Sequence, residues 1–363
     1  MYEFEYGRYG LIPAVDWLDV GQEVTRPNDP IDGLFGDERT DNLVARWESI
    51  AAEYQLPMMA QFHGFDTEAQ KTFRVPVDVH NVEKGLIKVK INQSERIRAL
   101  QGKGVQGSQA LYESVIGDGV RLADQVTTRT KVAKNELMAY GKVTIKENNL
   151  DLTVEYGVPA EHIAYTIDVS DAGDPLADIQ TIIDDAAAKG VVLTGVLTSN
   201  QMLSKLRKHS KVQAAINGAA GGMVKRQALM DHFAAEFGLS QVVTNDLSYG
   251  ASDSIGEDGR PVVKTARYYP ADRMTFFATN PAGKMGAGLW GLPPEATASQ
   301  FLQTGTSAEN PFVFVTQWVE SDPAEVWTKA SALYMPVLYN PNALWIATAT
   351  GAAAAASEPA AGE

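Results

Sequence analysis

The sequence predicts an α+β fold built from two structural units, and three observations support this. The chain has 363 residues, and at roughly 150 residues per domain this length corresponds to two or three units. A helical period of apolar residues extends over 108–140. Strand-like apolar runs occur on both sides of that segment in a mixed order, without the regular βα alternation of a parallel sheet.

The composition excludes several classes of protein. Hydrophobic residues make up 45% of the chain and charged residues 21%, as in an ordinary folded protein. Because there is no cysteine, the chain has no disulfide, thiolate metal site or cysteine nucleophile. The net charge of −14 argues against a protein whose main role is to bind nucleic acid. The acidic, aromatic start of the chain lacks the features of a signal peptide.

Residues 1–60 are predicted to form an extended N-terminal arm, because glycines and prolines interrupt every long period. Between positions 1 and 55 the segment has twelve acidic and four basic residues, a net charge of −8. Its many aromatic residues are unusual for a disordered tail. We therefore expect the arm to lie on another surface, with one short helix at about 41–53.

The next segment predicts a long two-stranded hairpin. Residues 72–79 and 86–91 alternate apolar and polar side chains, and 80–85 is turn-like. From 69 to 146 there are fourteen basic and seven acidic residues, a net charge of +7. Since a lone hairpin is only marginally stable in water, we expect this one to rest on something else, such as another subunit.

A long helix is predicted over 108–140, beginning at an N-cap Ser108 and ending at Gly141. At 1.5 Å per residue it would be roughly 50 Å long. One apolar stripe along it is formed by Leu111, Val115, Leu122, Val126, Ala133 and Leu137.

The remainder predicts alternating helices and strands. A second hairpin is expected at 142–156, and a helix at 175–189 between Asp174 and Gly190. Two further helices, 200–216 and 226–237, flank a glycine-rich loop at 217–222. Strands are predicted at 191–197, 241–244, 262–269, 273–278, 311–319, 326–339 and 343–349.

The strongest catalytic motif is the glycine pattern at 102–107, which matches Gly-x-Gly-x-x-Gly, with Asp124 at about the distance expected of a ribose-binding acid. The preceding residues are polar and charged, whereas a dinucleotide site needs a buried strand there. We therefore interpret this segment as a hinge before the long helix.

Other sequence features also fail to predict an enzyme. The Gly283–Lys284 pair lacks the spacing of a phosphate-binding loop, and the five histidines show no metal-ligand spacing. Ser252 is not in a nucleophile elbow. Asp184 and Asp185 are adjacent on a helix and so point in different directions. We predict no enzymatic activity and no cofactor.

Three groups of motifs carry a family resemblance. The first comprises 174–179, 190–193 and 202–206; the second comprises 269–276, 283–286 and 289–291; the third is 332–344. Together they resemble the major capsid proteins of tailed phages, which have the Hong Kong 97-type fold. The closest resemblance is to the major capsid protein E family of lambda-like phages.

The resemblance implies a domain organisation and a function. The expected parts are an N-terminal arm (1–60), an extended E-loop (61–100), a first part of the peripheral P domain (101–173, with the spine helix at 108–140), an inserted axial A domain (174–310), the return strands of the P domain (311–350) and a flexible C-terminal tail (351–363). Subunits of this kind form pentamers and hexamers that build an icosahedral head shell around phage DNA.

Candidate contact residues follow from this organisation and from the opposite charges of the arm and the hairpin. The candidates for contacts between subunits are Arg74, Lys84, Lys88, Asp37, Glu38 and Trp17. The candidates for a loop at the axis of each pentamer or hexamer are Asn217, Gly218, Gly221 and Gly222. Small residues suit a position where several copies crowd together.

The resemblance also implies partners and a location. We expect a homo-oligomer in the virion capsid, assembled in the host cytoplasm, with a portal protein, a decoration protein and packaged double-stranded DNA bound without sequence specificity. Because the arm starts at Met1, a separate scaffolding protein, or a scaffold peptide removed earlier, is expected. No membrane association is predicted. The alternatives are an encapsulin-like cellular compartment, a nucleotide-dependent oxidoreductase, and a decoration or tail-tube protein.

Overall fold

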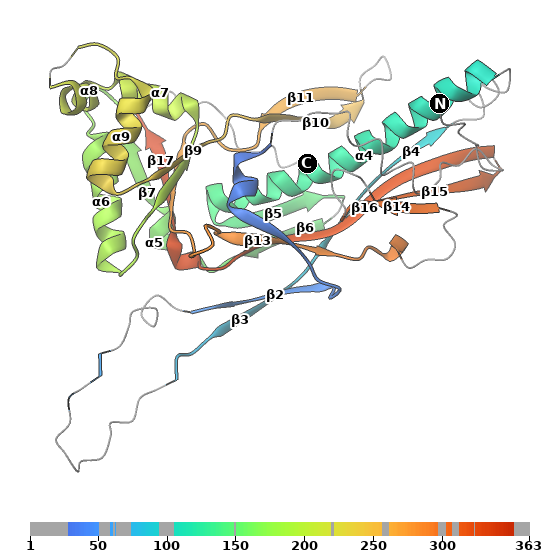
Figure 1. Ribbon diagram of the computed structural model, residues 1–363, viewed down its shortest axis with the longest axis horizontal. Helices are drawn as coiled ribbons and strands as arrows, with labels where there is room; N and C mark the ends of the chain where they lie inside the picture. The colour runs from blue at the N-terminus through green and yellow to red at the C-terminus, as the bar shows by residue number, and fades with distance from the viewer. Residues whose placement is uncertain are drawn as a thin grey trace.

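The long helix predicted in the middle of the chain runs along one unit of the structure (Figure 1). In the computed structural model, helix α4 extends over Val105–Tyr140. It ends at Gly141, whose φ of 69° is a conformation that glycine adopts readily and whose N–H donates to the Leu137 carbonyl at 2.8 Å. The structure describes residues 28–50, 59–60, 62, 74–93, 105–148, 150–218, 221–255, 261–296, 303–306, 312–322 and 324–351.

The apolar stripe predicted on this helix is confirmed where its side chains are described. Leu122, Val126, Ala133 and Leu137 are all buried. Leu111 and Val115 lie in the part of the helix whose side chains are not described. The stripe packs on a sheet, and residues from both contribute to one hydrophobic core.

That sheet has six strands and is arranged around one long strand, β16. Its path is β1-β13-β16-β15-β14, and β4 pairs with β16 off this path. Only β1 is parallel to its neighbour, β13; the other pairings are antiparallel. The strands are β1 (Phe35–Arg39), β4 (Gly85–Gln93), β13 (Gly286–Gly291), β14 (Gln303–Thr306), β15 (Phe314–Ser321) and β16 (Ala324–Leu338).

A second sheet of five strands, in the order β7-β17-β12-β8-β9, forms the other unit. It has its own core, to which α6, α7, α8 and α9 contribute buried apolar side chains. The strands are β7 (Tyr165–Asp168), β8 (Gly195–Thr198), β9 (Gln241–Thr244), β12 (Arg273–Phe277) and β17 (Leu344–Thr350). The helices are α5 (Ala160–Ile163), α6 (Pro175–Ala188), α7 (Asn200–Lys208), α8 (Ser210–Asn217) and α9 (Arg226–Phe237).

Three two-stranded ribbons and three short 3-10 helices complete the described chain. The ribbons pair β2 (Val44–Ser49) with β3 (Asp78–Glu83), β5 (Lys142–Glu147) with β6 (Leu150–Glu155), and β10 (Ser248–Ile255) with β11 (Pro261–Arg267). The 3-10 helices are η1 (Pro30–Gly33), η2 (Pro294–Ala296) and η3 (Pro341–Ala343). The β5–β6 ribbon is the second hairpin that the sequence predicts.

Two predictions for the first hundred residues are wrong. The segment 41–53 does not form a helix, because Ala45 and Trp47 are buried alternately with exposed neighbours and β2 pairs with β3. The hairpin between 72–79 and 86–91 does not form either. Strand β3 pairs with β2 and β4 pairs with β16, so the two segments join different partners.

The helix predicted at 200–216 is interrupted at His209. This residue is extended, with φ −68° and ψ 131°, so α7 ends before it and α8 begins after it. A ring nitrogen of His209 lies 2.8 Å from the Ser170 carbonyl oxygen, which fixes the break against the loop that follows β7.

The two sheets do not separate at the boundary predicted at 310. Strands β13 and β14 lie within the range assigned to the A domain, yet they belong to the six-stranded sheet. Strand β17 lies within the predicted return strands of the P domain, yet it belongs to the five-stranded sheet. The six-stranded sheet therefore contains two strands from the other side of that boundary, and the five-stranded sheet contains one.

Candidate assembly surfaces

Residues 28–39, here called the N-terminal strap, are bound tightly to their own subunit. Strand β1 adds to the edge of β13, and Ile31, Leu34 and Phe35 are buried in the core beneath α4. The start of η1 is capped by Asp29, whose carboxylate accepts from the Ile31 N–H at 3.0 Å. This part of the predicted arm is consequently an integral part of the fold.

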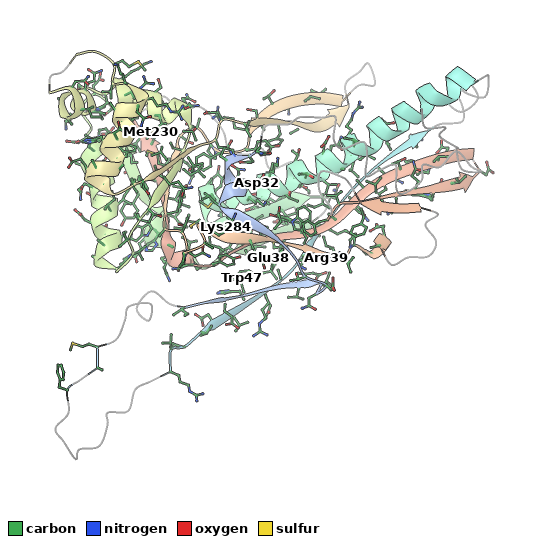
Figure 2. The ribbon with its side chains drawn as sticks, viewed as in Figure 1. Asp32, Glu38, Arg39, Trp47, Met230 and Lys284 are labelled. Atoms are coloured by element: carbon green, nitrogen blue, oxygen red, sulfur yellow. The ribbon has the colours of Figure 1, made fainter. Side chains whose placement is uncertain are left out.

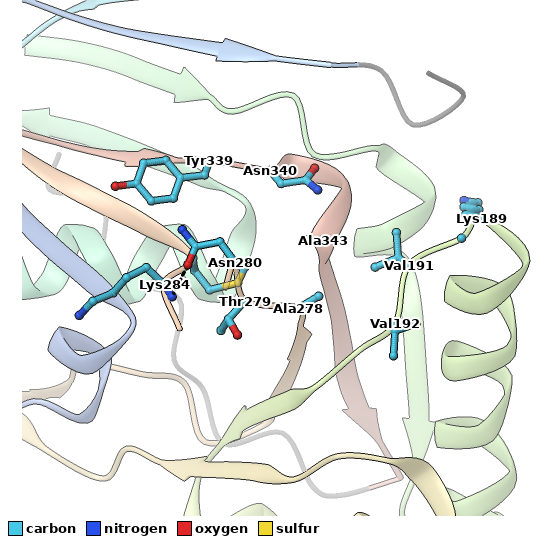
Figure 3. Close-up of a pocket in the computed structure, with 12 residues that line it drawn as sticks. Lys189, Val191, Val192, Ala278, Thr279, Asn280, Lys284, Tyr339, Asn340 and Ala343 are labelled. Carbon is cyan, nitrogen blue, oxygen red and sulfur yellow. Dashed lines mark hydrogen bonds between the residues drawn. The ribbon is translucent and has the colours of Figure 1, made fainter. Parts of the chain in front are cut away.

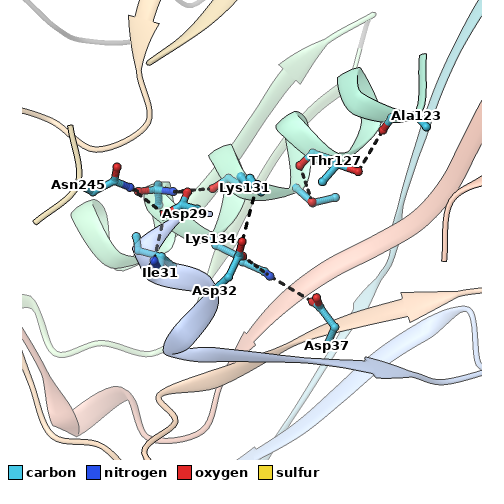
Figure 4. A network of polar contacts seen from close by, with 11 residues as sticks. Asp29, Ile31, Asp32, Asp37, Ala123, Thr127, Lys131, Lys134 and Asn245 are labelled. Atoms are coloured by element: carbon cyan, nitrogen blue, oxygen red, sulfur yellow. Dashed lines mark hydrogen bonds and ion pairs between the residues drawn. The ribbon is translucent and has the colours of Figure 1, made fainter. Parts of the chain in front are cut away.

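A buried polar network joins the strap to both structural units (Figure 4). The Asp29 carboxylate accepts from Asn135 on α4 at 2.8 Å and from Asn245, after β9, at 3.0 Å. Asn245 also donates to the side-chain oxygen of Asn135 at 2.8 Å. Burial raises the pKa of Asp29, while these hydrogen bonds favour its charged form. Three distant segments are therefore connected at one buried point.

Ion pairs hold the rest of the strap. The ammonium group of Lys134 on α4 lies 3.0 Å from Asp32 and 3.1 Å from Asp37. Asp37 also accepts from the indole N–H of Trp290 at 3.0 Å. Glu38 accepts from the Tyr339 hydroxyl at 3.1 Å. Asp37 and Glu38, predicted as contacts between subunits, thus have partners within their own chain.

The β2–β3 ribbon is anchored where it crosses the body of the subunit, near the position of Trp47 (Figure 2). The buried indole of Trp47 stacks on His80 of β3 at a centroid distance of 5.2 Å and on Tyr156 at 5.3 Å. The hydroxyl of Tyr156 in turn donates to the Pro336 carbonyl on β16 at 2.7 Å. From this aromatic anchor the ribbon projects away from both sheets (Figure 1).

Lys84, between β3 and β4, is an internal anchor, which corrects its prediction as a contact between subunits. Its side chain is only 3% exposed. The ammonium group donates to the carbonyl oxygens of Thr40 at 2.8 Å and Asn42 at 2.7 Å, and to the Thr40 hydroxyl at 2.6 Å. Burial lowers its pKa. Sequence reasoning identified the charge but not the carbonyl groups that surround it.

The other predicted contact residues are exposed or undescribed. Arg74 and Lys88 are exposed on the ribbon segment and on β4. Trp17 lies outside the described residues. Along the ribbon and its extensions several apolar side chains are also exposed: Leu43, Val44, Ile50, Met59, Phe62, Val75, Val77 and Val79. This surface is therefore apolar as well as charged.

The glycine-rich loop between α8 and α9 lies at the end of the molecule formed by the helices (Figure 1). Asn217, Gly218, Gly221 and Gly222 are all exposed. The three glycines have positive φ values of 73°, 137° and 89°, which explains the need for glycine. The structure brings these four residues together, and a hydrogen bond of 3.4 Å joins the Asn217 amide to the Gly222 carbonyl.

The catalytic motif considered in the sequence has no supporting geometry. The last part of the glycine pattern, from Val105 onward, is the first turn of α4. The strand before it, β4, pairs antiparallel with β16, and the helix leads into an antiparallel ribbon. A dinucleotide site requires a parallel βαβ unit at this point.

The described part of the chain shows neither a cluster of metal-binding side chains nor a helix that could span a membrane. Within the described residues, no group of three or more histidine, aspartate or glutamate side chains could hold a metal ion. None of the described helices combines the length and the apolar character needed to cross a membrane.

The connecting residues Asn135 and Asn245 were missed by sequence reasoning. Asn135 lies in α4 beside the apolar stripe. A polar residue next to such a stripe is only a weak indication that its side chain is buried with a hydrogen-bond partner. Asn245 follows a short strand and has no distinctive pattern around it. Their role depends on a contact across 110 positions of sequence.

Solved structures of phage proteins are similar to this chain. A phage-related protein from Bordetella bronchiseptica RB50 superposes with a TM-score of 0.51 at 11% identity, over 94% of this chain and 99% of the other. The putative capsid protein of a prophage of E. coli CFT073 has a TM-score of 0.48 at 15% identity, over 76% and 80% of the two chains. The capsid of Myoviridae phage XM1 gives 0.46 at 12% identity, over 94% and 99%.

Comparison with family models is more specific. Curated proteins provide no match to the chain. The family model described as phage major capsid protein E matches residues 90–349, which is more than half of the sequence. With the likeness to the Bordetella protein, this match confirms the predicted α+β capsid fold of the Hong Kong 97 type. This chain belongs to the phage major capsid protein E family, and it is a shell-forming structural protein of the phage head.

Proposed function

We propose that copies of this chain assemble as pentamers and hexamers into an icosahedral shell around double-stranded DNA, with the β2–β3 ribbon as a principal contact between copies. The role is structural and requires neither catalysis nor a cofactor. DNA is enclosed without sequence-specific contacts, in keeping with the net charge of −14.

The single observation that supports the ribbon contact is its exposed apolar surface. Val75, Val77 and Val79 are each more than a third exposed, on a segment that projects beyond the aromatic anchor at Trp47. A two-stranded ribbon is marginally stable on its own, and exposed contiguous apolar surface marks an interaction site. Burial against a neighbouring copy would supply most of the contact energy, while Arg74 and Lys88 set the register by charge.

A double substitution of Arg74 and Lys88 by glutamate tests the charged part of this proposal. We expect the variant subunit to fold normally, since both side chains are exposed, but to give a lower yield of shells. Shell yield can be measured by sedimentation and negative-stain microscopy at low and high salt. Normal shells at both salt concentrations would contradict the role of these two residues.

Lys142 and Lys146 provide the matched control. Both are exposed lysines on the β5 strand of a different ribbon. Substitution of both by glutamate changes the net charge by the same amount, so a loss of yield seen only with the Arg74 and Lys88 variant would reflect position rather than total charge.

We further propose that the loop at 217–222 lies near the axis of each pentamer or hexamer. Its exposed glycines present little side-chain bulk where several copies would converge. Replacing the exposed Asn217, which does not have a positive φ, by a bulky residue such as tryptophan should impair ring formation while leaving the subunit core intact. Rings of normal appearance and yield would count against this placement.

The family domain names are part of the proposal. The E-loop corresponds to 61–100 and the spine helix to 108–140. The A domain corresponds to 174–310 without β13 and β14 but with β17, and the P domain to 101–173 with β13, β14 and the return strands of 311–350. The N-terminal arm is 1–60 and the tail 351–363. A separate scaffolding protein, a portal protein and a decoration protein are proposed partners, and assembly is proposed to take place in the host cytoplasm.

A further inference from the structure

A pocket of about 280 Å³ opens between the two structural units (Figure 3). One wall is formed by Val191 and Val192, which follow α6. The opposite wall comes from the segment between β12 and β13, with Asn280, Lys284 and the buried Met285. The turn between β16 and β17 closes it with Tyr339, Asn340 and Ala343.

The polar groups described around this pocket already have partners in the chain. The Asn280 side-chain oxygen accepts from the N–H groups of Ala282 at 3.0 Å and Lys284 at 2.9 Å. The Lys284 ammonium donates to the Gly33 carbonyl at 2.9 Å, and the Tyr339 hydroxyl donates to Glu38. Lys189, at the rim, is paired with Glu161. A polar guest would gain little here, because these groups would have to exchange existing bonds.

The free surface that remains is apolar. Val192 is 78% exposed at the rim, and Tyr339 is 40% exposed. Sites for small molecules usually have volumes of about 300–1,000 Å³ with several converging polar groups, so this pocket is small and poorly equipped for such a ligand. Its size suits one large apolar side chain.

The chain also has large apolar side chains that are exposed in the single subunit. Phe62 is fully exposed and Met59 is 91% exposed, in the segment between β2 and β3. Aromatic side chains are the commonest anchors of protein interfaces, because burying one removes a large apolar area from water. In a shell every subunit is surrounded by copies of itself, so the exposed Phe62 side chain of one copy has the same pocket of other copies as a potential partner.

We propose that Phe62 of one copy inserts into the pocket beside Val192 of a neighbouring copy. This inference rests on the proposed role of the ribbon as a contact between subunits, and it assigns the receiving site. The occupant is a second copy of this chain, not a small molecule or a decoration protein.

The absence of cysteine from the sequence allows a direct test in assembled particles. The double variant Phe62→Cys/Val192→Cys is treated with a short bismaleimide, and the products are separated by denaturing electrophoresis. We expect a ladder of two, three and more linked chains. Particles of normal yield that give no ladder, or only an internally linked single chain, would overturn the inference while leaving the shell function intact.

Two comparisons keep the test decisive. The pair Phe62→Cys/Val263→Cys uses another exposed valine, 63% exposed on β11, and should remain unlinked. If cysteine at 192 prevents assembly, the melting temperature of particles with Phe62→Ala, Phe62→Leu and Val263→Ala gives a second measurement. We expect Phe62→Ala to lower the melting temperature of the particles and Phe62→Leu to restore most of it. Val263→Ala should leave it unchanged. Equal stability of all three particles would contradict the insertion.

Discussion

Lys84 shows how a charged residue can serve the fold instead of the surface. Its ammonium group satisfies carbonyl oxygens at Thr40 and Asn42, and it lies 3.2 Å from the Trp290 carbonyl oxygen. Lys84→Met should therefore destabilise the subunit by about 1–3 kcal/mol, since buried acceptors lose their donor. Urea unfolding measures this cost. Lys88→Met, at an exposed position on β4, is the control and should change stability by less than about 0.5 kcal/mol.

The buried network around Asp29 makes a second prediction. Asn245→Ala removes a donor to Asp29, a donor to Asn135 and the acceptor of the Leu247 N–H. A loss of about 1–3 kcal/mol in the free energy of unfolding is expected, because these groups remain buried. Asn217→Ala removes an exposed asparagine and should have little effect. Similar stability of the two variants would show that the network contributes nothing.

His162 predicts how stability depends on pH. Its buried ring stacks on Trp345 at 3.7 Å, and its Nε2 lies 3.1 Å from the Lys189 ammonium. Burial, and then the charge of Lys189, lower the pKa of His162 to about 4. In the unfolded chain the His162 ring is protonated below about pH 6.5, whereas in the folded chain it stays neutral down to about pH 4. The contribution of this residue to the free energy of unfolding is therefore fully present above pH 6.5 and is lost as the pH falls toward 4.

The variant His162→Phe keeps a ring against Trp345 but cannot be protonated. Its urea midpoint should fall less steeply than that of the unaltered protein between pH 6.5 and 4. The midpoint is measured in both proteins at several pH values in that range. Identical slopes would assign the acid sensitivity to other groups.

At the scale of single elements, the sequence predicts most clearly what depends on local periodicity. The long helix, the β5–β6 hairpin and α9 are found at or close to their predicted bounds, because their apolar period, caps and turn residues lie within the element. Strands β1 and β2 were missed because their pairing partners lie elsewhere in the chain. A charged strand such as β1 (Phe35–Arg39) forms only because β13 offers an edge.

The predicted contact residues also differ in whether their environment depends on local sequence or on distant parts of the chain. Arg74, Lys88 and the loop glycines were predicted as contact residues, and in the subunit they are exposed, as such contacts would require. Asp37, Glu38 and Lys84 were assigned from their charge alone, and their internal partners come from segments that no local pattern connects to them. Burial of a charged group depends on tertiary neighbours, so sequence reasoning could not separate these residues from the exposed ones.

At Gly286, strands β1, β13 and β16 pack so closely that an added side chain should destabilise the sheet. A Cβ atom at this position would lie 2.0 Å from the Val337 carbonyl oxygen and 2.7 Å from the Phe35 ring. Gly286→Ala should force β1 or β16 away from β13 and destabilise the subunit by about 1–3 kcal/mol, as measured by thermal unfolding. Gly36→Ala, where the added atom meets nothing within 4 Å, should be tolerated much better. A loss for Gly286→Ala no larger than that for Gly36→Ala would contradict the importance of this close packing.

For the whole molecule, the division of charge has a different meaning from the one that the sequence suggested. The acidic arm and the basic central region have net charges of −8 and +7 in the sequence. Part of this complementarity is used inside the subunit, where Asp32 and Asp37 pair with Lys134. Charge therefore binds the strap to helix α4 of its own subunit, and in the proposed shell the contacts between copies would depend more on the exposed apolar side chains of the ribbon.

The main sheet joins strands from the two ends of the chain, so it can be completed only when nearly the whole chain has been synthesised. Gly85 pairs with Tyr334, and Phe35 pairs with Gly286. Strands from the first quarter of the chain therefore cannot pair until the strands near its end have been synthesised. At roughly 5–20 residues per second, a ribosome needs on the order of 10–50 s to synthesise the intervening residues. A nascent or truncated chain lacks the strands that complete this sheet. We therefore expect incomplete translation products to be excluded from the particle without a separate proofreading step.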